Sequence, residues 1–174
     1  VCGGYAHHYL PTFKQPEIRM MLVSYAAMEA VHQEAYSLLL ETLGKSEDMY
    51  QEFFDIHAMM EKHEYLQDFS MKTPFDIAKT MAVYSAFTEG VQLFSSFAIL
   101  LNYPRHNLMK GMGQIVTWSI RDESLHVEGL SKLFRTFMQE HPELWTDKLK
   151  YEIYCAAEKT VELEDNFIDI CFDK

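Results

Sequence analysis

The sequence is poor in cysteine and has no long apolar run. It contains three cysteines, at positions 2, 155 and 171, in no CxxC spacing. An odd number without that spacing favours a reduced, cytoplasmic protein over a disulfide framework. The longest apolar stretch, residues 94–101, is much shorter than the roughly 20 residues of a transmembrane helix. The first residues, Val1-Cys2-Gly3-Gly4, lack the pattern of a signal peptide, so we expect neither a membrane partner nor secretion.

The sequence is also short of positive charge, glycine and proline. Lys and Arg total 15 against 26 Asp and Glu, a net charge of −11, which argues against binding to nucleic acid or to anionic lipid. The seven glycines and five prolines form neither a low-complexity tract nor a phosphate-binding loop. With 48% hydrophobic and 24% charged residues, the 174 residues suit a single globular domain, which we place at 1–174.

Apolar residues recur at steps of three and four along most of the chain, and no segment alternates as a strand would. The pattern predicts an all-α protein built on long helices. Pro16 and Pro74 suit the first turns of two helices, and Pro104 suits the end of one. Gly111 and Gly113 could interrupt the first turns of the helix that follows. The predicted helices cover residues 16–43, 46–69, 73–101, 105–140 and 143–170, after an irregular or briefly helical segment at 1–15.

Two segments carry the same pair of side chains, Glu29 with His32 and Glu123 with His126, each three residues apart. On a helix such residues are neighbours on one face. Both pairs fall on the apolar stripe of a predicted helix, so we expect them to point inward. A buried carboxylate needs a partner, because burying it alone costs several kcal/mol or more. We infer that the two pairs face one another and bind a pair of metal ions.

A third acid, Glu89, shares a predicted helix face with Ala82, Ala86, Leu93 and Phe97. Ferritin-like di-iron bundles use two Glu-x-x-His helices and one acid from each of two others. This sequence offers one such acid, and the fourth is missing. Imidazoles combined with carboxylates favour iron or manganese over magnesium or calcium. The plainer interpretation is that Glu89 is a surface acid and that its aromatic neighbours are only core.

Two more residues lie beside these motifs. Tyr36 follows His32 by four residues on the same predicted face, so its phenol could approach the metals. The alternative is an ordinary core tyrosine with one hydrogen bond. Asp122 immediately precedes Glu123 and could accept a hydrogen bond from the ring nitrogen of His32 that does not bind metal.

The segment Met28–Ser37 resembles the first Glu-x-x-His-x-x-x-Tyr segment of the class I ribonucleotide reductase small subunit. The segment Gly113–His126 resembles its second segment, down to Arg-Asp-Glu-x-x-His. Glu89 stands 34 positions before Glu123, where that family has its intervening acid. The resemblance runs over nearly the whole chain, and it implies a ferritin-like long-helix bundle with a buried dinuclear metal site.

The resemblance implies a protein that makes and stores a radical for the reduction of ribonucleotides to deoxyribonucleotides. Its metal site would hold two iron ions, or two manganese ions, and would react with O2 to oxidise Tyr36 to a tyrosyl radical. His32 and Asp122 would begin the path to the large catalytic subunit, and the small subunit would be a homodimer. The implied metal ligands are Glu29, His32, Glu89, Glu123 and His126, and the implied lining of the radical pocket is Leu93 and Phe97.

Three features of the family do not occur in this sequence. The family has a first acid, usually Asp, and a Trp of the radical path before the position of Val1. Its third feature is a C-terminal tail, with a relay Tyr and a docking peptide for the large subunit, after the position of Lys174. The resemblance therefore implies the central piece of a longer subunit, or half of a split one, and we expect incomplete metal loading of this chain by itself.

Two other functions are open from the sequence. One is a different di-metal carboxylate protein, such as an oxidase, a hydroxylase or a ferritin-like iron store. Tyr36 and Asp122 count against a store, which needs neither. The other is a helical bundle used only for assembly, in which the Glu-x-x-His pairs are buried hydrogen-bond networks. Metal content separates this last function from the others.

Overall fold

The computed structural model describes residues 2–172; Val1, Asp173 and Lys174, and the side chain of Cys2, lie outside the described residues. Within that range the chain forms helices and no strand, so the all-α prediction is confirmed. The long elements are α3 (Pro16–Thr42), α8 (Lys110–Glu140), α9 (Asp147–Phe172) and a rod formed by α6 (Pro74–Val83), the π-helix η2 (Tyr84–Gln92) and α7 (Phe94–Arg105). The short elements are α1 (Cys2–Gly4), η1 (Tyr5–Tyr9), α2 (Leu10–Thr12), α4 (Met49–Asp55), α5 (His57–Gln67) and η3 (Pro142–Leu144).

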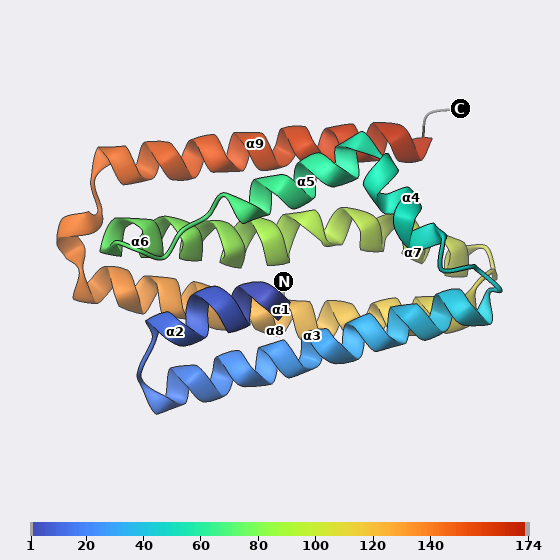
Figure 1. Cartoon of the computed structure of the whole chain (residues 1–174), viewed down its shortest axis with the longest axis horizontal. Coiled ribbons are helices and arrows are strands. Elements are labelled where there is room, and N and C mark those ends of the chain that lie inside the picture. The colour runs from blue at the N-terminus through green and yellow to red at the C-terminus, as the bar shows by residue number, and fades with distance from the viewer. Residues whose placement is uncertain (1, 173–174) are drawn as a thin grey trace.

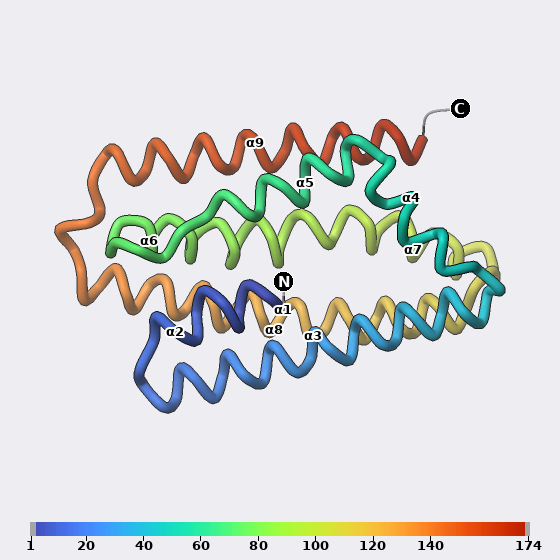
Figure 2. Tube along the Cα trace, in the orientation of Figure 1, coloured from blue at the N-terminus to red at the C-terminus, as the bar shows by residue number. Residues whose placement is uncertain are grey.

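The long helices lie side by side along one axis (Figure 1). α8 packs against α3 and against the α6–η2–α7 rod, while α9 packs against α6, η2 and α5. Figure 2 shows α4 crossing near one end of the bundle, after which α5 runs beside α9. The short helical segment from α1 to α2 packs on α3. α8 therefore packs both on α3 and on the rod.

The apolar stripes predicted for residues 16–43 and 105–140 face the core. In α3 the buried side chains are Leu22, Tyr25 and Glu29. In α8 they are Met112, Val116, Ser119, Glu123, His126, Leu130 and Leu133, together with Gly113. In each helix the buried acid lies on the same face as the apolar residues that pack against the core. Packing of that apolar face therefore also directs the acid inward.

The helix predicted over residues 46–69 is wrong as a single element. The chain forms α4 and α5, separated at Ile56, whose backbone is extended (φ −86°, ψ 106°). The break redirects the chain, so that α5 packs on α9. A local apolar pattern does not record this turn, because the direction of α5 is set by a helix that comes much later in the sequence.

The helix predicted over residues 73–101 begins as expected, because Thr73 and Asp76 form a capping box. Its middle is the π-helix η2, whose wider turn leaves Ala86 exposed although the 3.6-residue pattern places it inward. Its predicted end is also wrong. The helix continues through Pro104 in its last turn, where the proline ring packs close to Gly113 of α8.

The other boundaries differ by a few residues. α8 runs unbroken through Gly111 and Gly113, so these glycines do not interrupt it. The last helix begins at Asp147 rather than at residue 143, because the 3-10 turn η3 intervenes. Residues 2–12 are helical, and Tyr5 and Tyr9 of η1 are fully buried in the core.

Two observations bear on the environment of the chain. Cys155 and Cys171 are free thiols, one partly buried and the other exposed. Over residues 2–172, no helix combines the length and the apolar character that crossing a bilayer requires.

Gly113 is required where α8 approaches Pro104. A Cβ at residue 113 would lie 2.3 Å from Pro104 Cγ, whereas a Cβ at Gly111 would meet no heavy atom within 4 Å. We expect Gly113→Ala to lower the free energy of unfolding by about 1–3 kcal/mol through overpacking. Gly111→Ala, the matched control in the same helix, should raise it by about 0.5 kcal/mol. Urea denaturation measures both, and equal effects would show that this contact does not limit the packing.

Candidate metal centre

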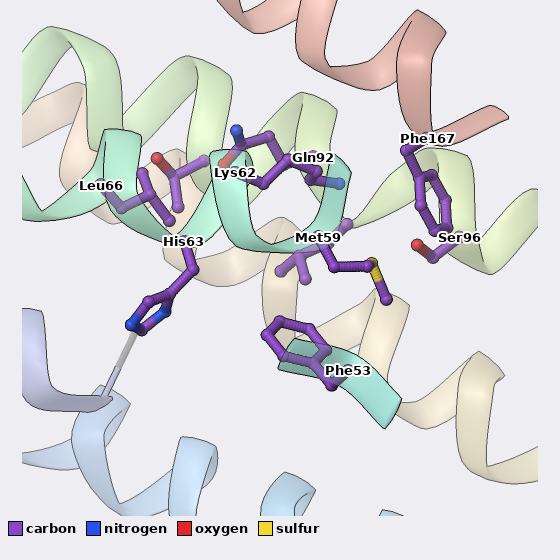
Figure 3. Close-up of a pocket in the computed structure, with 10 residues that line it drawn as sticks. Phe53, Met59, Lys62, His63, Leu66, Gln92, Ser96 and Phe167 are labelled. Carbon is purple, nitrogen blue, oxygen red and sulfur yellow. The ribbon is translucent and has the colours of Figure 1, made fainter. Parts of the chain in front are cut away.

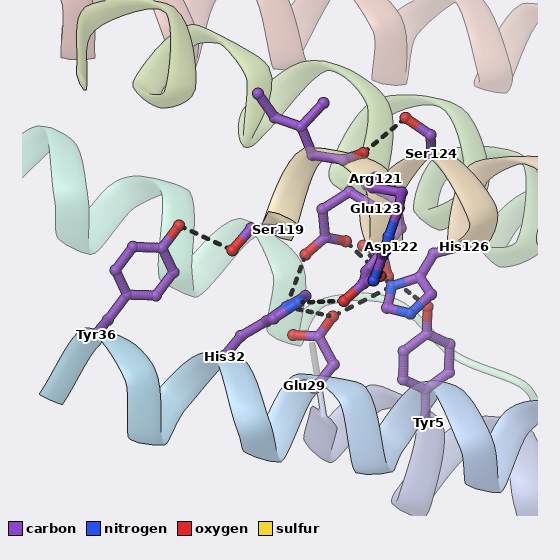
Figure 4. Close-up of polar contacts among 12 residues, drawn as sticks. Tyr5, Glu29, His32, Tyr36, Ser119, Arg121, Asp122, Glu123, Ser124 and His126 are labelled. Atoms are coloured by element: carbon purple, nitrogen blue, oxygen red, sulfur yellow. Dashed lines mark hydrogen bonds and ion pairs between the residues drawn. The ribbon is translucent and has the colours of Figure 1, made fainter. Parts of the chain in front are cut away.

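Four buried side chains converge inside the bundle. Glu29 comes from α3, Glu89 from η2, and Glu123 and His126 from α8, and one potential ligand atom from each lies within 4.8 Å of the other three. Glu89 and His126 are completely inaccessible to solvent. Figure 4 shows Glu29, Glu123 and His126 pointing toward one another. The structure thus brings together four of the five ligands expected from the sequence.

His32, the fifth, stands at the edge of this cluster. Its Nδ1 lies 3.1 Å from Glu123 Oε1 and 3.8 Å from Glu29 Oε1. His126 is placed in the same way, with its Nδ1 at 3.1 Å from Glu123 Oε2 and 3.2 Å from Glu29 Oε1. Each histidine therefore presents its Nδ1 to the same carboxylates, and Glu123 contacts the two imidazoles through its two different oxygens.

The other ring nitrogen of His32 is occupied by Asp122. The Nε2 of His32 lies 3.3 Å from Asp122 Oδ2, and Asp122 Oδ1 accepts from the guanidinium of Arg121 at 3.4 Å. A carboxylate on Nε2 favours the tautomer that carries its proton there, which leaves the Nδ1 lone pair directed at the cluster. The side chain of Asp122 is 18% exposed, against 3% for Glu123. This contact therefore links the buried cluster to the surface.

The crowding of carboxylates governs protonation in the cluster. Burial raises the pKa of Glu89 above its ordinary value. Burial acts in the same direction on Glu123, but contacts with the two imidazoles outweigh it and lower the pKa of Glu123. Burial alone would lower the pKa of His126, whereas its contacts with the three carboxylates raise that pKa to about 11. In the absence of metal, protons therefore supply the positive charge that the carboxylates need.

The same crowding suits the cluster to divalent metal ions. Its donors are carboxylate oxygens and imidazole nitrogens, a set that iron and manganese accept. Two buried carboxylate oxygens of the cluster, Glu29 Oε1 and Glu89 Oε2, make no hydrogen bond among the described residues, although each lies within 4 Å of His126 Nδ1. Unpartnered buried oxygens cost free energy, and cations bound between them would remove that cost while displacing the protons. The residues present therefore fit a metal site.

Tyr36 lies beside the cluster rather than within it (Figure 4). Its hydroxyl donates to Oγ of Ser119, on α8, at 3.0 Å. It lines a cavity of about 540 Å³ whose walls include Glu123, Leu93 and Phe97. Burial raises the pKa of Tyr36, so the phenol keeps its proton at neutral pH. The two residues expected to line a radical pocket, Leu93 and Phe97, thus share a cavity with this phenol.

A second cavity, of about 260 Å³, is also lined by Leu93. Thr88 and Gln92 of η2 lie in its wall, and Thr88 Oγ1 and Gln92 Nε2 are buried without a hydrogen-bond partner among the described residues. Figure 3 shows Lys62 and Gln92 beside this space. Buried polar atoms next to a cavity are usually satisfied by water. η2 therefore presents Glu89 to the cluster, and Thr88 and Gln92 to a separate cavity.

One buried phenol at the site is not predicted by the sequence. Tyr5 of η1 donates to Glu89 Oε1 at 2.5 Å. It stands in a segment whose sequence shows no helical stripe, so no local signal marks it. Ser119 lies on the same predicted apolar stripe as Glu123, and this position could have marked it as a buried residue near the site. Its contact with Tyr36 depends on how α3 and α8 dock, which the sequence does not show.

Comparisons with known proteins agree with this geometry. A family model described as "Ribonucleotide reductase, small chain" matches residues 3–174. The chain is 43% identical over 192 residues to the probable ribonucleoside-diphosphate reductase small subunit 376L of Invertebrate iridescent virus 6, over 100% of this chain and 53% of that protein. It is 29% identical over 175 residues to the ribonucleoside-diphosphate reductase subunit beta of Chlamydia pneumoniae, over 91% and 50%. The chain spans about half the length of the curated relatives it matches.

A solved structure has a similar fold. It is the crystal structure of a putative class I ribonucleotide reductase from Bacillus halodurans, which matches with a TM-score of 0.86 over 97% of this chain and 63% of that one. The sequence identity of 22% limits this match to the fold. The predicted fold class, a ferritin-like bundle of long helices, is thereby confirmed.

We expect the cluster to bind divalent metal, and Glu29→Gln to weaken that binding. The amide keeps the size of the side chain but loses the charge that offsets the metal, so the affinity for Fe(II) or Mn(II) should fall at least about tenfold. Glu34→Gln is the matched control, because Glu34 is exposed on the same helix. Metal analysis after dialysis against graded metal concentrations measures both variants. Equal binding by the two would exclude Glu29 as a ligand.

Proposed function

The chain belongs to the ribonucleotide reductase small-chain family, and on that premise we propose that it contains the radical-generating centre of a ribonucleoside-diphosphate reductase. The observation that carries the proposal is the convergence of three buried carboxylates and an imidazole on one small volume, next to a cavity that holds a tyrosine. Such a group of acids is costly to bury unless cations bind it. A phenol in the adjoining cavity gives those cations a side chain to oxidise.

The proposed metal ligands use the Nδ1 atom of each histidine and the carboxylates between them. Glu123 would hold metal together with both histidines, because each of its two oxygens lies next to a different imidazole. Two redox-active ions held there would react with O2 and supply the oxidising power for the tyrosine. We propose iron, and the same donors accept manganese. The proposed ligands are Glu29, His32, Glu89, Glu123 and His126.

Tyr36 is the proposed radical site. It stands in the Glu-x-x-His-x-x-x-Tyr segment on which the family resemblance rests, and Tyr5 does not. Oxidation of Tyr36 would remove one electron, for which the O2-treated metal pair would be the acceptor, and the phenolic proton, for which Glu123 in the wall of the same cavity would be the base. The apolar side chains of Leu93 and Phe97 in the same cavity keep reactive groups away from the radical.

His32 and Asp122 are the proposed exit for the oxidising equivalent. Their hydrogen bond joins a cluster histidine to a carboxylate that is partly exposed. We propose that the equivalent passes from there to a large catalytic subunit, which reduces ribonucleotides to deoxyribonucleotides. A homodimer of the small subunit in the cytoplasm completes the proposal, and the free thiols of Cys155 and Cys171 are consistent with that compartment.

Tyr36 and Asp122 support this function over the other di-metal functions. An iron store would share the carboxylates and imidazoles of the cluster. It would not require a phenol in the adjoining cavity, nor a carboxylate fixed on the outer nitrogen of a ligand histidine. An assembly-only bundle would gain no stability from packing three acids together, because apolar side chains of similar size usually pack there at lower cost.

A complete subunit that contains this chain, loaded with Fe(II) and exposed to O2, should give a tyrosyl radical signal in electron paramagnetic resonance. Tyr36→Phe should abolish that signal and leave the metal content unchanged, because the ring still packs but carries no hydroxyl. Tyr50→Phe is the matched control, since Tyr50 lines the same cavity while its hydroxyl bonds to Ser37. An undiminished signal in Tyr36→Phe would place the radical on another residue.

Asp122→Asn should spare the radical and slow turnover with the large subunit about tenfold or more. The neutral amide is a weaker acceptor for the Nε2 proton of His32 than the carboxylate is. Glu128→Gln is its control, as Glu128 is an exposed acid on the same helix. Radical content by electron paramagnetic resonance and deoxyribonucleotide formation are measured on the same samples. Turnover equal to that of the unsubstituted protein would remove Asp122 from the path.

A further inference from the structure

Ser119 places a hydroxyl group against the phenol that the proposed function oxidises. The Tyr36 hydroxyl on α3 donates to Ser119 Oγ on α8 at 3.0 Å (Figure 4). The serine is 2% exposed. It stands one helical turn before Glu123 on the buried stripe of α8. The contact therefore joins the phenol to the helix that carries two of the proposed ligands.

Ser119 differs from other hydroxyl residues of α8 in how its oxygen is used. Thr117 donates to the carbonyl of Gly113 at 2.8 Å, and Ser124 donates to the carbonyl of Ile120 at 2.7 Å. Such bonds to the carbonyl four residues earlier are the ordinary choice for a hydroxyl within a helix. Ser119 instead accepts a hydrogen bond from a side chain of another helix.

We propose that Ser119 is a positioning residue for Tyr36, which holds the phenol in the resting protein and donates a hydrogen bond to its oxygen in the radical state. The second half of this statement rests on the proposed function. Oxidation would remove one electron from Tyr36, for which the O2-treated metal pair would be the acceptor, and the phenolic proton, for which Glu123 in the wall of the same cavity would be the base. The oxygen of Tyr36, which donates before oxidation, can afterwards only accept.

A serine hydroxyl is able to follow that reversal. It has one hydrogen and two lone pairs, and the hydrogen rotates to suit its partner. Polar side chains such as Gln33 and Glu123 also line the adjoining cavity, but the hydrogen bond that the Tyr36 hydroxyl makes among the described residues is to Ser119. We therefore expect Ser119 to decide whether the radical oxygen is hydrogen-bonded, a property that affects both its spectrum and its reduction potential.

Metal-free protein tests the resting hydrogen bond. The chain has 10 tyrosines, and labelling them with carbon-13 at Cζ gives one resonance for each, with Tyr36→Phe identifying that of Tyr36. Ser119→Ala removes the acceptor, so the Tyr36 resonance should move upfield while the others stay in place. Ser119→Thr restores a hydroxyl and should return the resonance toward its original position. Ser124→Ala is the matched control on the same helix and should leave it unchanged.

Metal-loaded protein tests the radical state. A hydrogen bond lowers the largest g-value of a tyrosyl radical, so Ser119→Ala should raise that value in high-field electron paramagnetic resonance. The coupling to an exchangeable deuteron, seen after transfer to D2O, should be lost. Ser119→Thr should retain both features. All these variants should bind the same amount of metal, because Ser119 lies outside the proposed ligand set.

The outcomes separate the inference from the proposed function. An unchanged Tyr36 resonance in Ser119→Ala overturns the resting hydrogen bond. A radical whose g-value and deuteron coupling are unaffected by Ser119→Ala overturns the role in the oxidised state and leaves the proposed function standing. If the unsubstituted, metal-loaded protein gives no radical, the proposed function and the oxidised-state role both fall, while the resonance of the metal-free protein still decides the resting contact.

Discussion

The structure depends on neutralising three carboxylates that share one buried volume. Like charges a few ångströms apart repel strongly where water is excluded. The packing of α3, η2 and α8 nevertheless holds Glu29, Glu89 and Glu123 together. Two imidazoles and the hydroxyl of Tyr5 contact these carboxylates and partly offset their negative charge. Because an apolar core would be cheaper to assemble, the acids make physical sense as a place for cations rather than as a source of stability.

The inward direction of Glu29 and Glu123 could be predicted, because each stands on a stripe whose apolar members must face the core whatever the tertiary details. The link between His32 and Asp122 could also be predicted, from the chemistry of a ligand histidine. Helix boundaries set by local residues, such as the capping box at Thr73, were accessible in the same way. Helical periodicity and local chemistry therefore predict the positions of the site residues that belong to the two Glu-x-x-His motifs.

What the sequence could not predict depends on contacts between distant segments. The π-helix η2 changes the spacing before Glu89, so Ala86 is exposed although the 3.6-residue pattern places it on the same inward face as that acid. The break at Ile56 and the arrival of Tyr5 at Glu89 both result from how separate elements dock. No pattern within a helix records such docking. The parts of the site that escaped prediction are therefore those supplied by a neighbour across a helix interface.

The origin of the cluster in three separate helices has a consequence for how the protein assembles. α3, η2 and α8 can each become helical early, since their stripes are local, but the ion-binding volume exists only after all three have docked. Cations that bind the native arrangement and not its precursors add their free energy to the last step of assembly alone. Metal bound to this cluster would therefore stabilise the docked arrangement of the three helices and not the separate helices. Removing such metal would first weaken the packing between the three helices, while each helix keeps its own backbone hydrogen bonds.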